Sequence, residues 1–70
     1  MNNEYTTVIK QDGDLWIGWI EEIQGVNCQE MTYPELLESL KITLQEALQF
    51  NREEAIMSAG ADYREERIAL

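Results

Sequence analysis

Histidine is absent from the 70 residues, and cysteine occurs once, at Cys28. The lack of histidine removes the commonest general base and the commonest transition-metal ligand. A single cysteine excludes a disulfide within the chain and a cysteine-based zinc cluster. An unpaired thiol also fits a reducing cytoplasm better than a secreted, disulfide-linked scaffold. The sequence therefore predicts a cytoplasmic protein that needs no cofactor.

Positive charge is scarce, since five lysines and arginines face fourteen acidic residues and give a net charge of −9. Phosphate backbones repel such a domain, so direct nucleic-acid binding is disfavoured. A basic protein would be attracted, mainly through the rate and specificity of encounter. The simpler alternative, that acidity only confers solubility, stays open. No stretch approaches the roughly 20 apolar residues of a membrane span, so membrane insertion is not expected.

The chain is short for a stable hydrophobic core. We interpret residues 1–70 as one domain, and a core of that size is marginal without disulfides, a metal or self-association. Because the first two aids are missing, we expect a homo-oligomer, a dimer or larger.

The first half of the chain has the pattern of a β-hairpin followed by a weaker strand. Glu4–Lys10 is rich in β-branched and aromatic residues, Gln11–Asp14 supplies an Asp-Gly turn, and Leu15–Ile20 forms the second strand. After a loop over Glu21–Gly25, Val26–Met31 alternates less clearly as a third strand. The sequence therefore predicts an antiparallel three-stranded meander.

The second strand is apolar on both faces. Leu15, Ile17 and Trp19 alternate with Trp16, Gly18 and Ile20, whereas a strand covered by one helix should be polar on its open side. We interpret the excess as a surface buried by another molecule, most economically a second copy. A single tryptophan half exposed at a sheet edge is the alternative.

A long amphipathic helix follows the third strand. Thr32 and Glu35 have the spacing of a capping box, Pro34 is tolerated in the first turn, and Gly60 suits a helix end. The predicted helix runs to about Met57. Its buried stripe comprises Leu36, Leu37, Leu40, Leu44, Ala47, Leu48 and Ala55, while Ile42 and Phe50 fall outside it.

The last eight residues have no decisive pattern. Tyr63–Leu70 alternates in a way that favours a final strand, although its composition would also suit a helix. The predicted fold class is α+β with the order β-β-β-α-β: the three-stranded antiparallel meander, one helix and a final strand.

No catalytic constellation is present in the sequence. Asp12 and Asp14 flank a turn glycine, Glu21 and Glu22 are loop neighbours, and the helical glutamates lie largely away from the leucine stripe. A calcium loop, a Gly-rich phosphate loop and a Ser-centred elbow are all missing. We therefore expect no enzymatic activity, no metal site and no cofactor.

Taken in order, these segments resemble the HicB-like antitoxin family. That family has a Tyr-Thr-Val-Ile-type strand, an acidic-Gly turn, an aromatic-rich strand and a Thr-x-x-Glu-Leu helix start. The counterparts here are Tyr5–Ile9, Asp12–Asp14, Leu15–Ile20 and Thr32–Leu36, and Asn51–Ala55 and the final segment resemble stand-alone members. The family's Pro-Glu-Leu-Pro-Gly loop stands as Glu21–Gly25, without either proline.

The resemblance implies a partial RNase H-like fold without that enzyme's catalytic acids, as a single HicB-like domain. It also implies an antitoxin that neutralises a small basic, mRNA-degrading, HicA-like toxin by protein binding in a type II toxin-antitoxin system. Larger members add a C-terminal DNA-binding domain, and we expect a stand-alone member that lacks it. The alternatives are an orphan homo-oligomeric HicB-like protein, with an adaptor or unknown role and no toxin, and a degenerate nuclease with metal-dependent RNA cleavage.

Candidate contact residues follow from exposure and charge. We expect large apolar side chains to anchor the partner and carboxylates to surround them. The candidate anchors are Trp16, Trp19, Ile42 and Phe50, and the candidate rim charges are Glu21, Glu22 and Glu30.

Overall fold

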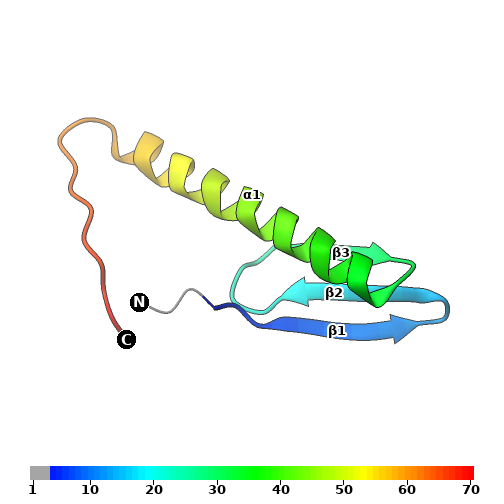
Figure 1. Cartoon of the computed structure of the whole chain (residues 1–70). Helices are drawn as coiled ribbons and strands as arrows, with labels where there is room; N and C mark the ends of the chain where they lie inside the picture. The colour runs from blue at the N-terminus through cyan, green and yellow to red at the C-terminus, as the bar shows by residue number, and fades with distance from the viewer. Residues whose placement is uncertain (1–3) are drawn as a thin grey trace.

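The chain folds as a three-stranded antiparallel sheet with one long helix, so the α+β class is confirmed (Figure 1). The computed structural model describes residues 4–70. The strands are β1 (Thr7–Asp12), β2 (Leu15–Ile20) and β3 (Asn27–Glu30), in the spatial order β1-β2-β3, and the helix is α1 (Tyr33–Ala59).

The predicted hairpin is confirmed, although β1 lies slightly later in the sequence than the pattern indicated. Asp12 pairs with Leu15 across a two-residue turn, and Thr7 pairs with Ile20 at the other end. Gly13 in that turn has a φ of 62°, a left-handed conformation that glycine adopts without steric cost. The meander is completed by β3, which is four residues long.

Both ends of α1 are closed by the residues that the sequence singled out. The Glu35 backbone N–H donates to Thr32 Oγ1 at 3.3 Å, and the Thr32 hydroxyl donates to Glu35 Oε1 at 2.7 Å. At the other end Gly60 has a φ of 73°, and its N–H donates to the Ile56 carbonyl oxygen at 3.2 Å. The capping interaction and the glycine stop are therefore confirmed.

The fully buried core is small and lies between the sheet and the first half of α1. It consists of Ile20, Val26, Leu36 and Leu40. The helix backbone lies close to β2 and β3, whereas β1 lies farther away and contributes Ile9, which packs partly buried against the core. One side of β1 therefore receives little cover from the helix.

The second half of α1 extends past the sheet. A helix of 27 residues is about 40 Å long, while a strand of six residues spans about 20 Å. Of the predicted stripe, Leu44 and Ala47 pack against the core, but Leu37 is 37% exposed and Ala55 is exposed. The stripe was thus predicted too long, because no sheet lies beneath the distal turns of α1.

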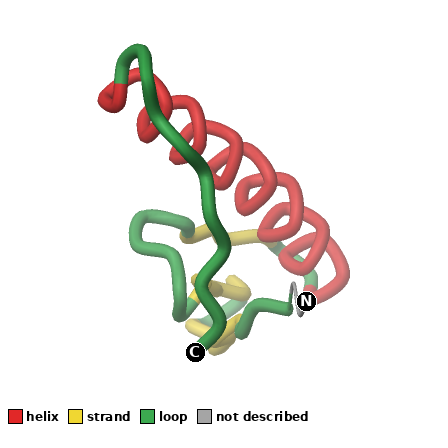
Figure 2. The backbone as a smooth tube through the Cα atoms, turned by 90° about the vertical axis from the view of Figure 1, so that its left-hand side faces the viewer, coloured by secondary structure: helices red, strands yellow, loops and turns green. Residues whose placement is uncertain are grey.

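The final strand predicted over Tyr63–Leu70 is not formed in the structure of the single chain. These residues follow the end of α1 as a segment without regular structure, drawn as loop throughout in Figure 2. Strand alternation is present in the sequence, but a strand needs a hydrogen-bonded neighbour, and no strand pairs with this segment in the structure. The fourth strand and the RNase H-like arrangement are therefore not formed within the described chain.

Within residues 4–70, the helix α1 does not combine the length and the apolar character that a membrane span needs.

Candidate partner-binding surface

One face of the sheet is not covered by α1. Side chains alternate along a strand and paired residues share a face. Trp16, Gly18 and Ile20 face the helix, so the intervening residues of β2 and their partners face away from it. We call this surface the open sheet face, and it comprises Val8, Lys10, Asp12, Leu15, Ile17, Trp19, Asn27 and Gln29.

The open sheet face is apolar at its centre. Trp19 pairs with Val8 and is 39% exposed, and Leu15 and Ile17 are half-buried although no helix covers them. The apolar surface on both sides of β2 is therefore present in the structure as the sequence indicated. A face of this kind is suited to contact with another protein.

Two carboxylates border the open sheet face beside Trp19. The loop between β2 and β3 and the neighbouring strand ends enclose a hollow of about 600 Å³, lined in part by Trp19, Glu21 and Glu22. The Thr6 backbone N–H donates to Glu22 Oε1 at 2.8 Å, and this hydrogen bond lowers the pKa of the Glu22 carboxyl below its usual value. Glu22 is thus held in the charged form beside an exposed tryptophan.

Two of the predicted contact residues lie at the opposite end of the sheet and are engaged by the fold itself. Trp16 faces the helix, where its ring meets the Tyr33 ring edge to face, with centroids 5.3 Å apart. Glu30 pairs with Trp16 across the sheet and accepts a hydrogen bond from Ser39 Oγ at 2.6 Å. The structure therefore places Trp16 and Glu30 apart from the open sheet face.

The two candidate anchors on α1 are both exposed, Ile42 at 49% and Phe50 at 61%. Phe50 borders a second hollow with Gly25 and Val26, so it lies across the β2–β3 loop from Trp19. The structure thus brings Trp19, Glu21, Glu22 and Phe50 to one loop. Ile42 lines neither of these hollows.

No group of three or more His, Cys, Asp or Glu side chains among residues 4–70 is placed to hold a metal ion. Cys28 is half-buried, with its sulfur 3.4 Å from Thr43 Oγ1.

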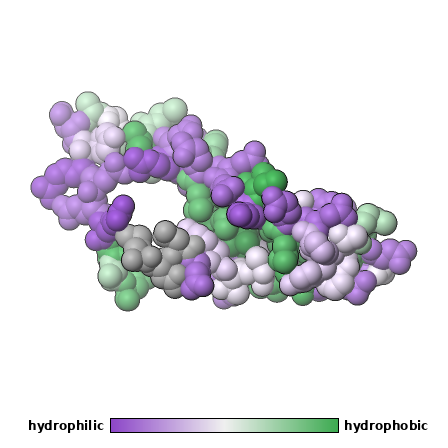
Figure 3. Space-filling view, in the orientation of Figure 1, coloured by the Kyte–Doolittle hydropathy of each residue, from purple (hydrophilic) through white to green (hydrophobic). Residues whose placement is uncertain are grey.

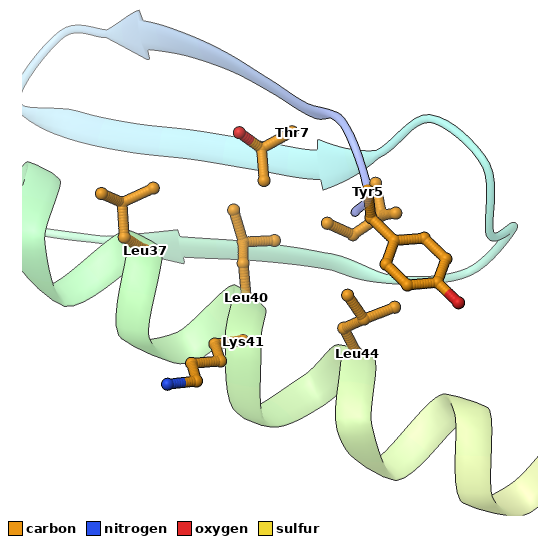
Figure 4. A pocket seen from close by; sticks show the side chains of 7 residues that line it. Tyr5, Thr7, Leu37, Leu40, Lys41 and Leu44 are labelled. Carbon is orange, nitrogen blue, oxygen red and sulfur yellow. The ribbon is translucent and has the colours of Figure 1, made fainter. Parts of the chain in front are cut away.

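Sequence reasoning missed a second apolar feature, a groove of about 220 Å³ between β1 and α1. We call it the edge groove. Leu37, Leu40 and Leu44 point from α1 towards the sheet, the Tyr5 ring lies over Leu44, and the Lys41 ammonium points away (Figure 4). The sequence pattern places Leu37 in the buried stripe, and only the lateral offset of α1 from β1 reveals that it lines a groove.

Comparison of the chain with protein-family models, with curated proteins and with solved structures finds no match.

Proposed function

We propose that this protein is a small cytoplasmic antitoxin-like binding module of the HicB-like kind. It would neutralise a small basic, mRNA-degrading, HicA-like toxin by covering the toxin's RNA-binding site. The observation that carries the proposal is the open sheet face, where exposed Trp19 lies beside the carboxylates of Glu21 and Glu22. A fourth strand formed by Tyr63–Leu70, whether it pairs within one chain or with a second copy, and with it an RNase H-like arrangement, belongs to the same proposal.

The chemistry of the surface matches a basic partner. The carboxylates, within a chain of net charge −9, attract a cationic protein over a distance of about 8–10 Å at physiological salt. Trp19 and its apolar neighbours then supply contact area, because buried aromatic side chains contribute most of the affinity of protein interfaces. In this proposal the protein acts by binding and performs no catalysis.

Salt tests the electrostatic part of the proposal. We expect the association rate with a basic toxin to fall by roughly tenfold between low and physiological ionic strength, while the dissociation rate changes little. Stopped-flow or surface-based kinetics at several salt concentrations would measure both rates. An association rate that does not depend on salt would exclude acidic steering.

Substitution of Trp19 tests the apolar part of the proposal. The chain is used as bait in extracts of its host, and a small basic protein recovered with it is assayed for RNA cleavage. We expect Trp19→Ala to raise the concentration of chain needed to neutralise that cleavage by roughly 30-fold or more, as for an interface hot spot.

A matched control separates this effect from loss of folding. Met57→Ala also truncates an exposed apolar side chain, but on distal α1, and we expect it to leave neutralisation unchanged. Both variants are compared by circular dichroism for folded content. Equal neutralisation by Trp19→Ala and the wild type would contradict the assignment of the open sheet face.

The second candidate is an orphan homo-oligomer with no toxin, serving as an adaptor. The large uncovered apolar surface on both sides of the sheet favours it as well. The orphan homo-oligomer would be supported if the bait were recovered alone and no small basic protein were encoded beside its gene.

A further inference from the structure

Strand β1 is an unpaired edge of the sheet. It pairs with β2 on one side, and among the described residues no strand adjoins its other side. The Glu21 N–H donates to the Thr6 carbonyl oxygen, and hydrogen-bonded pairs alternate along antiparallel strands. The backbone groups of Thr7, Ile9 and Gln11 therefore point outward, ready to bond another strand.

The edge groove lies beside this free edge and shares its apolar character. Leu37 and Leu44 line it from α1, and Tyr5 and Thr7 line it from the β1 side. In the orientation of Figure 1, hydrophobic side chains reach the surface between α1 and the sheet (Figure 3). A strand added to β1 would place every second side chain over this groove.

The C-terminal segment, Tyr63–Leu70, has the alternating sequence of a strand, but no strand pairs with it in the structure. Ile68 is 86% exposed, Leu70 is fully exposed, and these two alternate with Arg67 and Ala69. In space filling, an opening remains between this segment and distal α1 (Figure 3). Its apolar side chains thus lie in solvent while an apolar groove in the same molecule is uncovered.

We propose that a second copy of this chain fills the edge groove: residues 66–70 of each protomer pair with β1 of the other, and Ile68 and Leu70 cover the groove. The result is a strand-exchanged homodimer. This proposal does not depend on any toxin, and it leaves the open sheet face free.

Chain length favours exchange between copies over closure within one chain. The Arg52 guanidinium donates to both Glu65 carboxylate oxygens, at 2.6 and 3.4 Å, and so fixes the base of the segment to distal α1. The distance along the helix from Gly60 back to the level of Leu44 is about 24 Å. The chain after Gly60 needs roughly seven extended residues to cover that distance. Only the last three residues would then reach the start of the chain's own β1.

The exposed surface of the single chain is also large for its mass, which favours a large contact. The chain exposes 5991 Å², whereas a compact monomer of 8.2 kDa exposes about 4,500 Å². Its radius of gyration is 15.2 Å, against about 11 Å for a compact domain of this length. An excess of roughly 1,500 Å² per protomer corresponds to an obligate homodimer interface.

Charge is arranged to permit the exchange. Residues 1–51 hold nine of the carboxylates and only the two lysines, while all three arginines lie in residues 52–70. Arg64 and Arg67 of one copy would therefore approach the acidic sheet and helix of the other.

The first test is the mass of the full chain in solution by sedimentation equilibrium. We expect a dimer, and we expect Ile68→Asp to weaken it by roughly 30-fold or more, because a charge would replace a buried aliphatic side chain. Ala69→Asp adds the same charge on the opposite side of the segment and should weaken dimerisation much less. A monomeric wild type, or equal effects of the two variants, would overturn the proposal.

Cross-linking then locates the contact, in a Cys28→Ser background. Lys10→Cys protein and Ala69→Cys protein are mixed and oxidised, since both positions would lie on the side of the sheet away from α1. We expect the disulfide between the Lys10→Cys and Ala69→Cys proteins to form roughly tenfold faster than the disulfide between the Gln29→Cys and Ala69→Cys proteins, because Gln29 lies on the far strand β3. Equal rates would contradict the proposal, as would a chain carrying both cysteines that closes internally and stays monomeric.

Discussion

Leu40→Ala is expected to lower the free energy of unfolding by about 3 kcal/mol. Leu40 is only 1% exposed and packs with Ile20, Val26 and Leu36 in the core. Truncation of a buried leucine loses its transfer free energy and leaves a cavity, at a cost of about 2–5 kcal/mol. A domain of 70 residues has roughly 4–10 kcal/mol in total, so this variant should be close to unfolding at 25 °C.

Urea denaturation at a fixed protein concentration would measure this effect, because oligomerisation makes apparent stability depend on concentration. Ile42→Ala is the matched control, since it also truncates an aliphatic side chain on α1 but at a half-exposed position. We expect it to change stability by less than about 1 kcal/mol. Equal losses at both positions would show that the core is not the one described.

Gly18→Val is expected to destabilise the fold by about 3 kcal/mol, and Gly18→Ala by about 1 kcal/mol. A Cβ atom at position 18 would lie 2.9 Å from Leu40 Cδ1 and 3.2 Å from Leu36 Cδ2. The absence of a side chain here lets α1 approach β2 closely. Either the two leucines or the whole helix would have to shift to admit a larger residue.

A double-mutant cycle tests the assigned contact. In a Leu40→Ala background the nearest clash is removed, so Gly18→Val should cost at least about 1 kcal/mol less than in the wild type. Thermal or urea unfolding of the four proteins gives the coupling free energy. Strictly additive effects would show that α1 does not lie against Gly18.

The two faces of the sheet have separate roles in our proposals. The open sheet face, with Trp19, Glu21 and Glu22, is assigned to a basic partner, and the edge groove beside β1 to a second copy. A dimer with no toxin partner would support the exchange and reject the antitoxin proposal. A monomer that binds a toxin would support the antitoxin proposal and reject the exchange. The two proposals can therefore fail separately.

Most of the secondary structure could be predicted from the sequence because it depends on local interactions. The Asp12–Asp14 turn, the Thr32–Glu35 cap and the Gly60 stop each depend on a few neighbouring residues, and all three are found where expected. The two apolar faces of β2 were predictable for the same reason, because alternation is a property of the strand alone. The local pattern could not show that Trp16 and Glu30 contact α1, because their partners Tyr33 and Ser39 come from a separate element.

The sequence by itself determined the strands, the helix, their caps and the acidic charge, since these depend on neighbouring residues or on composition. Only the tertiary structure decided that α1 lies over β2 and β3 and covers β1 less, and that its distal half runs past the sheet. It also decided that Tyr63–Leu70 has no strand beside it in the single chain. The physical reason is that helix position and strand pairing depend on side chains distant in sequence, here Gly18 against Leu36 and Leu40, which no local pattern records.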